Sequence, residues 1–314
     1  MVDTFGTLPA EVGKYYDRLL LSRALPTLYL PKIGQARNLP KNNGNNVSYR
    51  RFNTLATVTT ALTEGLTPNP TNLSVTEVTG TVAEYGNYVE VSDALDLMAV
   101  DQVIRESVTL LGENGGQSVE EIMRAELVTG TSVLYATGST RGAQTASSPI
   151  TLSLVRKATR NLNANNAMPF YGERDGKGQG GMYIGYIHPN AWYDLQGDTQ
   201  VLNTFSYSDP DKLYTLDLPT LGGVAWIVST KAPIFSGQGL AGADVYGTFV
   251  FGREAFGALN VAGTGMWQTL VKQVGSSGAA DPLNQRGSIG WKSFQMPKIL
   301  NNTFFLRIEA GVSP

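Results

Sequence analysis

A long hairpin with almost no apolar core is the feature that most constrains the fold of this chain. Two extended runs, residues 47–62 and 75–91, are rich in Thr and Val, whose β-branched side chains favour strands. The turn region between them contains Glu64, Gly65 and Pro68, so the pattern predicts a loop longer than a tight two-residue turn. A two-stranded hairpin without a core is marginal alone in water. We therefore expect it to lie on another surface, as an arm that grips a neighbouring chain in a polymer.

Residues 93–130 have the apolar period of a helix, and Ser92 or Asp93 can cap its start. The periodic apolar side chains of the first half are Val100, Val103, Ile104, Val108 and Leu111. A glycine-rich run, residues 112–116, weakens the middle, since each Gly costs about 1 kcal/mol relative to Ala. The sequence leaves open whether this is one long helix with a soft joint at the glycines or two helices.

The rest of the chain alternates predicted helices and strands. A helix is predicted from Leu152 to Asn165, and a shorter one from Asn190. Strands are predicted at residues 181–188, 224–229 and 246–251, followed by a strand-rich part from 267 to 308. No repeat of fixed period is present. The predicted fold class is α+β.

Residues 1–46 are predicted to form an extended N-terminal arm. It contains a short helix, residues 14–25, which Pro26 ends. The polar, Asn-rich run at residues 41–46 is typical of a surface loop. The first residues lack the basic stretch followed by an apolar segment that marks a secretory signal, so we expect none.

Composition excludes several classes of function. The chain has no cysteine, which excludes disulfides and thiolate metal sites and suits a reducing cytoplasm. Its 24 basic and 26 acidic side chains give a net charge of −2, whereas proteins that bind duplex DNA through phosphates normally have a basic excess. No apolar run has transmembrane length. We therefore expect neither a membrane partner nor tight nucleic-acid binding.

No motif supports catalysis. A catalytic triad would have to use the one histidine, His188, which is more simply a strand-end residue beside a turn. The glycine-rich run at residues 176–181 lacks the Gly-Lys-Ser/Thr ending of a phosphate-binding loop. Glu120 and Glu121 point apart on a helix, so neither is expected to be a general acid with a shifted pKa. The predicted protein is not an enzyme and has no cofactor and no metal.

The order of elements resembles the Hong Kong 97-type capsid fold, and short segments resemble the podovirus-type family of tailed-bacteriophage major capsid proteins. These segments are Leu62-Thr63-Glu64-Gly65 with Pro68, Tyr85-Gly86, residues 127–136, the helix from Leu152 with Arg156 and Ala158, residues 281–292, and Ile299-Leu300-Asn301 with Arg307-Ile308-Glu309. No single segment is specific, but five of them occur in the right order between Tyr49 and Glu309. The strongest match is Asp281 to Lys292.

The resemblance implies a division of the chain. Residues 1–46 would be the N-terminal arm, 47–92 the extended hairpin loop, 93–149 the spine helix with part of the peripheral domain, 150–265 the axial domain, and 266–314 the return to the peripheral domain. The extended loop would lie across an adjacent subunit.

The resemblance also implies a function, that of a major capsid protein which self-assembles into hexamers and pentamers of an icosahedral head. The head would enclose packaged double-stranded phage DNA without sequence-specific binding. The protein would be assembled in the host cytoplasm and reside in the virion, with scaffold, portal and decoration proteins as candidate partners. The alternatives are an encapsulin-like nanocompartment of the same fold and, from a different class, a hydrolase dependent on His188.

Two segments are predicted to carry the subunit contacts, the hairpin from Thr54 to Val91 and the C-terminal segment from Asp281 to Lys292. The residues selected are Glu64, Gly65, Pro68, Tyr85, Asp281, Gln285, Arg286, Trp291 and Lys292.

Overall fold

The computed structural model describes most of the chain, namely residues 20, 28–39, 44–53, 55–65, 67–98, 103–171, 181–202, 220–261, 268–272, 283 and 285–313. Three predicted features lie outside these residues. They are the helix at residues 14–25, of which only Leu20 is described, the glycine-rich run at 176–181, of which only Gly181 is described, and Asp281.

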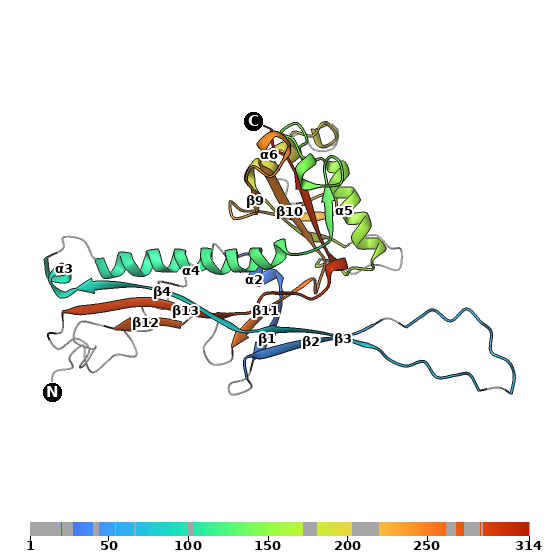
Figure 1. Ribbon diagram of the computed structural model, residues 1–314, viewed down its shortest axis with the longest axis horizontal. Coiled ribbons are helices and arrows are strands. Elements are labelled where there is room, and N and C mark those ends of the chain that lie inside the picture. Colours follow the sequence, from blue (N-terminus) through green and yellow to red (C-terminus); the bar gives the residue numbers. More distant parts are fainter. Residues whose placement is uncertain are drawn as a thin grey trace.

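A long, flat layer forms the lower part of the molecule in Figure 1. Helix α4 (Val103–Val128) lies along a three-stranded antiparallel sheet in the order β12 (Gln268–Lys272), β13 (Arg286–Gln295) and β4 (Ala83–Ser92). The apolar face of the helix is buried against this sheet. The buried residues of the contact are Leu20, Val108, Leu111, Ile289 and Trp291.

The start of the predicted helix is confirmed, and the alternative left open at its glycines is settled in favour of one continuous helix from Val103 to Val128. The Ser92 hydroxyl accepts a hydrogen bond of 3.3 Å from the Leu95 amide and so caps α3 (Asp93–Met98). Helix α4 then runs unbroken through the glycine-rich run. Gly112, Gly115 and Gly116 are buried there. Their burial on the helix explains why the low helix propensity of glycine does not break it, because tertiary packing overrides propensity.

The predicted hairpin exists, but its paired part is short. Strand β2 (Asn46–Phe52) pairs antiparallel with β3 (Val75–Thr81), from Asn46 opposite Thr81 to Phe52 opposite Val75. The predicted continuation of the first strand to residue 62 is wrong, since residues 55–62 form no strand. The second run divides at Val82, and its far half is β4, which pairs with β13 over its whole length. A strand needs a partner, and residues 55–62 have none among the residues that the structure describes.

A compact body stands on one end of this layer (Figure 1). Its seven-stranded mixed sheet has the order β5-β15-β10-β6-β8-β7, with β9 beside β10. The strands are β5 (Val133–Tyr135), β6 (Tyr183–Ile187), β7 (Thr220–Leu221), β8 (Val224–Val228), β9 (Ile234–Phe235), β10 (Val245–Phe251) and β15 (Phe305–Ala310). Helices α5 (Leu152–Ala164) and α6 (Pro189–Gln196) contribute to its apolar core. These elements confirm the helices and the strands predicted for residues 152–251, and the α+β class.

A third sheet connects the body with the flat layer. It contains β1 (Gln35–Leu39), β11 (Phe256–Val261) and β14 (Lys298–Ile299), preceded by the short helix α2 (Leu30–Ile33). The remaining 3-10 turns are η2 (Arg141–Ala143), η3 (Leu240–Gly242) and η5 (Asn302–Phe304).

Candidate subunit-contact site

The loop between β2 and β3, residues 53–74, extends away from the rest of the molecule (Figure 1). We call it the arm loop. Every described residue of it from Leu55 to Ser74 is exposed. Glu64 and Gly65 form its turn, and Gly65 has a φ of 79°, a left-handed conformation that glycine adopts without strain. Pro68 follows on the returning limb, exposed.

The arm loop and its base carry large apolar side chains in contact with solvent. The exposed fractions are 67% for Phe52, 51% for Leu55, 79% for Val58, 74% for Leu62 and 67% for Leu73. Burying one such side chain contributes about 1.5–3 kcal/mol, and a row of them on one projecting segment marks an interaction surface. This surface is therefore the main candidate for contact with another chain.

Trp291 is the buried anchor of the C-terminal segment. Its side chain is 3% exposed, and its Nε1 donates a hydrogen bond of 3.1 Å to Asn114 Oδ1. Asn87 Nδ2 donates to the same oxygen at 3.2 Å. One side chain of α4 thus ties the helix to both β13 and β4.

The other predicted contact residues of this segment lie on or beside the same sheet. Lys292 Nζ forms an ion pair with Glu84 and lies 5.2 Å from the ring centroid of Phe294. Tyr85 is half-buried against the helix–sheet core. The carbonyl of Gln285 accepts a hydrogen bond of 3.0 Å from the Asp93 amide, and Arg286 is exposed.

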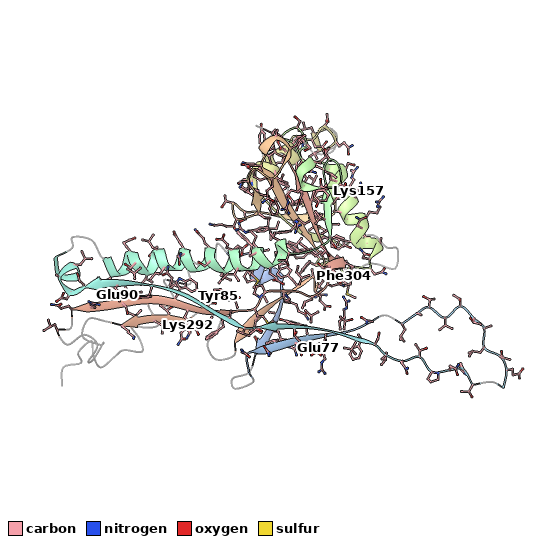
Figure 2. The ribbon with its side chains drawn as sticks, viewed as in Figure 1. Glu77, Tyr85, Glu90, Lys157, Lys292 and Phe304 are labelled. Carbon is pink, nitrogen blue, oxygen red and sulfur yellow. The ribbon has the colours of Figure 1, made fainter. Side chains whose placement is uncertain are left out.

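The predicted contact residues therefore form two groups that one chain does not bring together. Glu64, Gly65 and Pro68 lie in the projecting arm loop, whereas Lys292 lies on the far side of the layer (Figure 2). A chain with contact surfaces at both ends can bind a neighbour head to tail.

A buried carboxyl joins three parts of the chain. Glu120 on α4 is fully buried and accepts hydrogen bonds of 3.1 Å from the amides of Tyr29 and Leu30. Burial raises the pKa of Glu120 to about 7, although those two amides, the Tyr186 hydroxyl and the charge of Lys32 oppose the shift. The interpretation that this carboxyl has an ordinary pKa is wrong. Its hydrogen bonds connect the N-terminal segment, the helix and the body.

A second buried network joins the end of α4 to the body. Glu309 on β15 is fully buried, and its carboxylate accepts hydrogen bonds from Arg307 Nε at 2.7 Å and from Arg141 at 2.6 and 2.8 Å. The Arg307 guanidinium also donates to the carbonyls of Val128 and Gly130. These are unpaired carbonyls at the end of a helix, where a cation is favoured. The network therefore holds the helix at a defined position against the sheet.

We expect Gly130→Ala to destabilise this junction by about 1–3 kcal/mol through overpacking. A Cβ at this position would lie 2.3 Å from the Phe305 ring, which is buried. Gly142→Ala is the matched control, since a Cβ there meets no atom within 4 Å. Urea unfolding of both variants measures the difference, and equal stabilities would contradict the close contact.

His188 takes the structural role that the sequence predicted. It follows β6, caps α6, and its Nδ1 accepts a hydrogen bond of 3.2 Å from the Asn190 amide. Partial burial lowers its pKa. Among the described residues, no three His, Asp or Glu side chains lie close enough to hold a metal ion. No described helix has the length and apolar character to cross a membrane.

Sequence reasoning missed the two buried carboxyls. The Leu30 amide that binds Glu120 is 90 positions away and the Arg141 guanidinium that binds Glu309 is 168 positions away, whereas Arg307, which also binds Glu309, is only two positions away. The one available signal was their position among apolar residues of a predicted helix and strand.

The fold is shared with solved phage capsids, although no family model and no curated protein sequence matches this chain. The capsid of cyanophage Pam1 is 17% identical, with a TM-score of 0.71 over 93% of each chain. The capsid of Ralstonia phage GP4 is 12% identical, with a TM-score of 0.68 over 91% of this chain and 89% of that one. A virus-like particle from Pyrococcus furiosus is 12% identical, with a TM-score of 0.52 over 95% of this chain and 100% of that one.

The likeness covers about nine-tenths of the chain in both phage capsids. At these identities it establishes architecture, and the architecture agrees with the one expected from the sequence resemblance. The chain has the Hong Kong 97-type fold of tailed-phage capsid proteins.

Proposed function

We propose that the chain is the major capsid protein of a tailed phage. It self-assembles into hexamers and pentamers of an icosahedral head around double-stranded DNA and resides in the virion. The observation that carries this proposal is the exposed arm loop, whose apolar side chains have no partner within the described part of the chain. The fold, shared with several phage capsids, supports it.

The proposed mechanism of assembly is physical and needs no catalysis. The arm loop of each subunit lies across the next one, which buries its apolar residues, and such a head-to-tail contact closes into a ring. Residues 1–46 act as the N-terminal arm, 47–92 as the extended loop, and 93–149 with 266–314 as the spine and peripheral domain. Residues 150–265 act as the axial domain that lines the ring centre.

In this proposal the shell encloses DNA, and the capsid protein does not bind it sequence-specifically. The net charge of −2 suits a wall that encloses nucleic acid without strong attraction to its phosphates. Scaffold, portal and decoration proteins are the proposed additional partners.

Replacing residues 55–73 with a short Gly-Ser linker is expected to abolish assembly while leaving the subunit folded. The described residues of the loop are exposed, so their removal takes no contact from the core, and the melting temperature should change by less than about 2 °C. Sedimentation velocity reports assembly and calorimetry reports folding. Normal shells from the loop-deleted chain would contradict the proposed role of the loop.

Negative-stain microscopy of the purified full chain tests the proposal as a whole. Shells, tubes or capsomer rings are expected at high protein concentration, and a strict monomer would overturn it. The alternative, an encapsulin-like compartment, draws support from the likeness to the Pyrococcus furiosus particle. Particles isolated from the native source distinguish the two, because a phage head contains DNA and a nanocompartment contains a protein cargo.

A further inference from the structure

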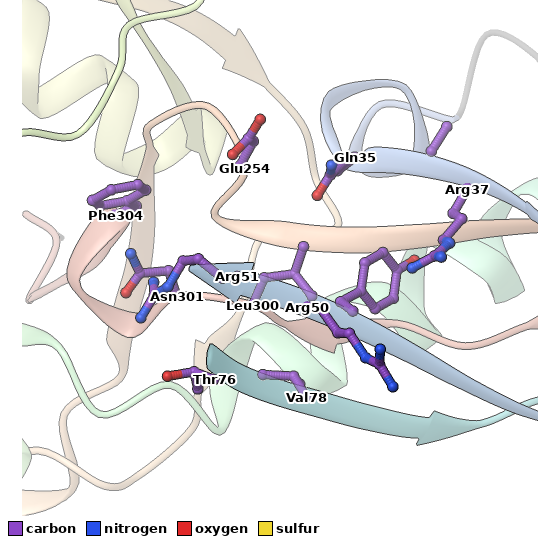
Figure 3. Close-up of a pocket in the computed structure, with 12 residues that line it drawn as sticks. Gln35, Arg37, Arg50, Arg51, Thr76, Val78, Glu254, Leu300, Asn301 and Phe304 are labelled. Atoms are coloured by element: carbon purple, nitrogen blue, oxygen red, sulfur yellow. The ribbon is translucent and has the colours of Figure 1, made fainter. Parts of the chain in front are cut away.

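A pocket of about 300 Å³ lies where β1, β2 and β3 meet the turn before β15 (Figure 3). Three arginines line it, Arg37 from β1 and Arg50 and Arg51 from β2. Its walls also include apolar side chains, those of Tyr49, Val78, Leu300 and Phe304. A pocket with both guanidinium groups and apolar walls suits a carboxylate that has an apolar neighbour.

The three arginines differ in the contacts that they already make within their own chain. Arg37 donates a hydrogen bond of 2.6 Å to the Ser48 carbonyl, and its guanidinium lies 5.4 Å from the Tyr49 ring centroid. Arg50 lies 3.6 Å from Glu77 and points out of the pocket (Figure 3). Arg51 makes no ion pair or hydrogen bond with any residue for which the structure gives contacts, and it extends along the pocket toward Asn301 (Figure 3).

The pocket carries a single positive charge in excess. Glu77 pairs with Arg50, and Glu254 is the acidic residue among those that line the pocket, so three guanidinium groups stand against two carboxylates. One remaining positive charge complements one carboxylate.

Two larger hollows on the described surface have equal numbers of positive and negative side chains. The one on β4, β12 and β13, of about 530 Å³, carries two lysines and two glutamates. The one beside α4, of about 760 Å³, carries Glu126 and Lys298, which form an ion pair with each other at 2.9 Å. Of these three, the arginine pocket is therefore the best acceptor for a carboxylate.

The arm loop offers the matching chemistry. Glu64 is its only ionisable residue between positions 53 and 74, and it lies exposed at the turn. Leu62, two residues earlier, is 74% exposed. Leu62 and Glu64 are both exposed and only two positions apart, so the loop tip presents an apolar side chain and a carboxylate near each other. The tip is directed away from the pocket of its own chain (Figure 1), so the partner has to be another chain.

We propose that the arginine pocket of one subunit receives the loop tip of a second copy, with Glu64 on Arg51 and Leu62 against the apolar wall. This inference rests on the proposed function and names the partner surface of its arm loop. The loop's apolar residues supply most of the contact area, and the Glu64 ion pair sets where along the neighbour the loop comes to rest, since charge pairs fix register and exclude wrong partners.

Charge reversal in the full chain tests the pairing. Glu64→Arg and Arg51→Glu are each expected to reduce shell yield at least about tenfold, and the double variant is expected to restore it, because the reversed charges attract again. Both side chains are exposed, so the subunits should stay folded, which circular dichroism checks. Lys157→Glu, at an exposed position on α5 outside both groups of predicted contact residues, is the matched control and should assemble normally.

Chemical cross-linking gives a second readout that does not depend on assembly yield. The chain has no cysteine, so Glu64→Cys with Arg51→Cys introduces the two thiols that a short bismaleimide can join. Covalent ladders of subunits are expected from this variant and none from Glu64→Cys with Lys157→Cys.

The outcomes separate this inference from the proposed function. Normal shells from both single reversals, or ladders only with the Lys157 control, would overturn the pairing while leaving the capsid role intact. Absence of shells from the unaltered chain would overturn the capsid role itself. The pairing would also be overturned if both single variants were folded but failed to assemble and the double variant did not restore shells.

Discussion

Replacing Glu309 with Gln is expected to lower the free energy of unfolding by about 3 kcal/mol. The substitution keeps the shape of the side chain but leaves the Arg307 guanidinium, whose side chain is 6% exposed, without its charged partner. Arg141 also loses its carboxylate, although it is more accessible and lies 3.5 Å from the Phe235 ring centroid. Urea unfolding of the unassembled subunit measures the change.

Glu121→Gln is the control for this prediction. Glu121 forms an ion pair of 2.7 Å with Arg124, but its side chain is 59% exposed, so solvent screens the pair and the expected change is below about 0.5 kcal/mol. Similar losses in the two variants would mean that the buried network does not stabilise the junction of helix and body.

The stability of the subunit is expected to fall as pH rises from 4.5 to about 7, because of Glu120. Its carboxyl has a pKa of about 7 in the folded chain and 4.5 as its ordinary value, so in this interval the folded state holds a proton that the unfolded state has lost. Stability then decreases by about 1.4 kcal/mol per pH unit. The protonated Glu120 carboxyl thus contributes about 3 kcal/mol to the free energy of unfolding. This contribution is fully present below pH 4.5 and is lost above pH 7.

Glu120→Gln is expected to remove this slope and to be more stable than the unaltered chain at pH 8. The amide oxygen can still accept from Tyr29 and Leu30, and no buried charge remains. Burial lowers the pKa of His188, so this side chain also contributes to the pH dependence of stability. The quantity to follow is therefore the free energy of unfolding of the unaltered chain minus that of the variant. That difference isolates Glu120, and a constant difference from pH 4.5 to 8 would refute its raised pKa.

Elements with a complete local pattern were predictable. Helix α5 has its apolar side chains on one face, and it begins one residue after Thr151, whose hydroxyl accepts from the Leu154 amide at 3.4 Å. Both the period and the cap lie in consecutive residues, so the sequence contains the whole signal.

Elements whose outcome depends on a distant partner were not predictable. Residues 55–62 have strand propensity but find no partner strand, whereas β4, of similar composition, pairs with β13 roughly 200 positions later. The arginine pocket is assembled in the same way, from two strands near the start of the chain and a turn near its end.

The sequence by itself determined the class of the fold, the projecting loop with its single carboxylate, and the absence of any cysteine chemistry, because each follows from which residues are neighbours along the chain. Only the tertiary structure decided which strands pair, that Glu120 and Glu309 are buried, and that Arg37 and Arg51 share a pocket. Burial and charge pairing depend on distances in space between residues far apart in sequence, and those distances exist only once the chain has folded.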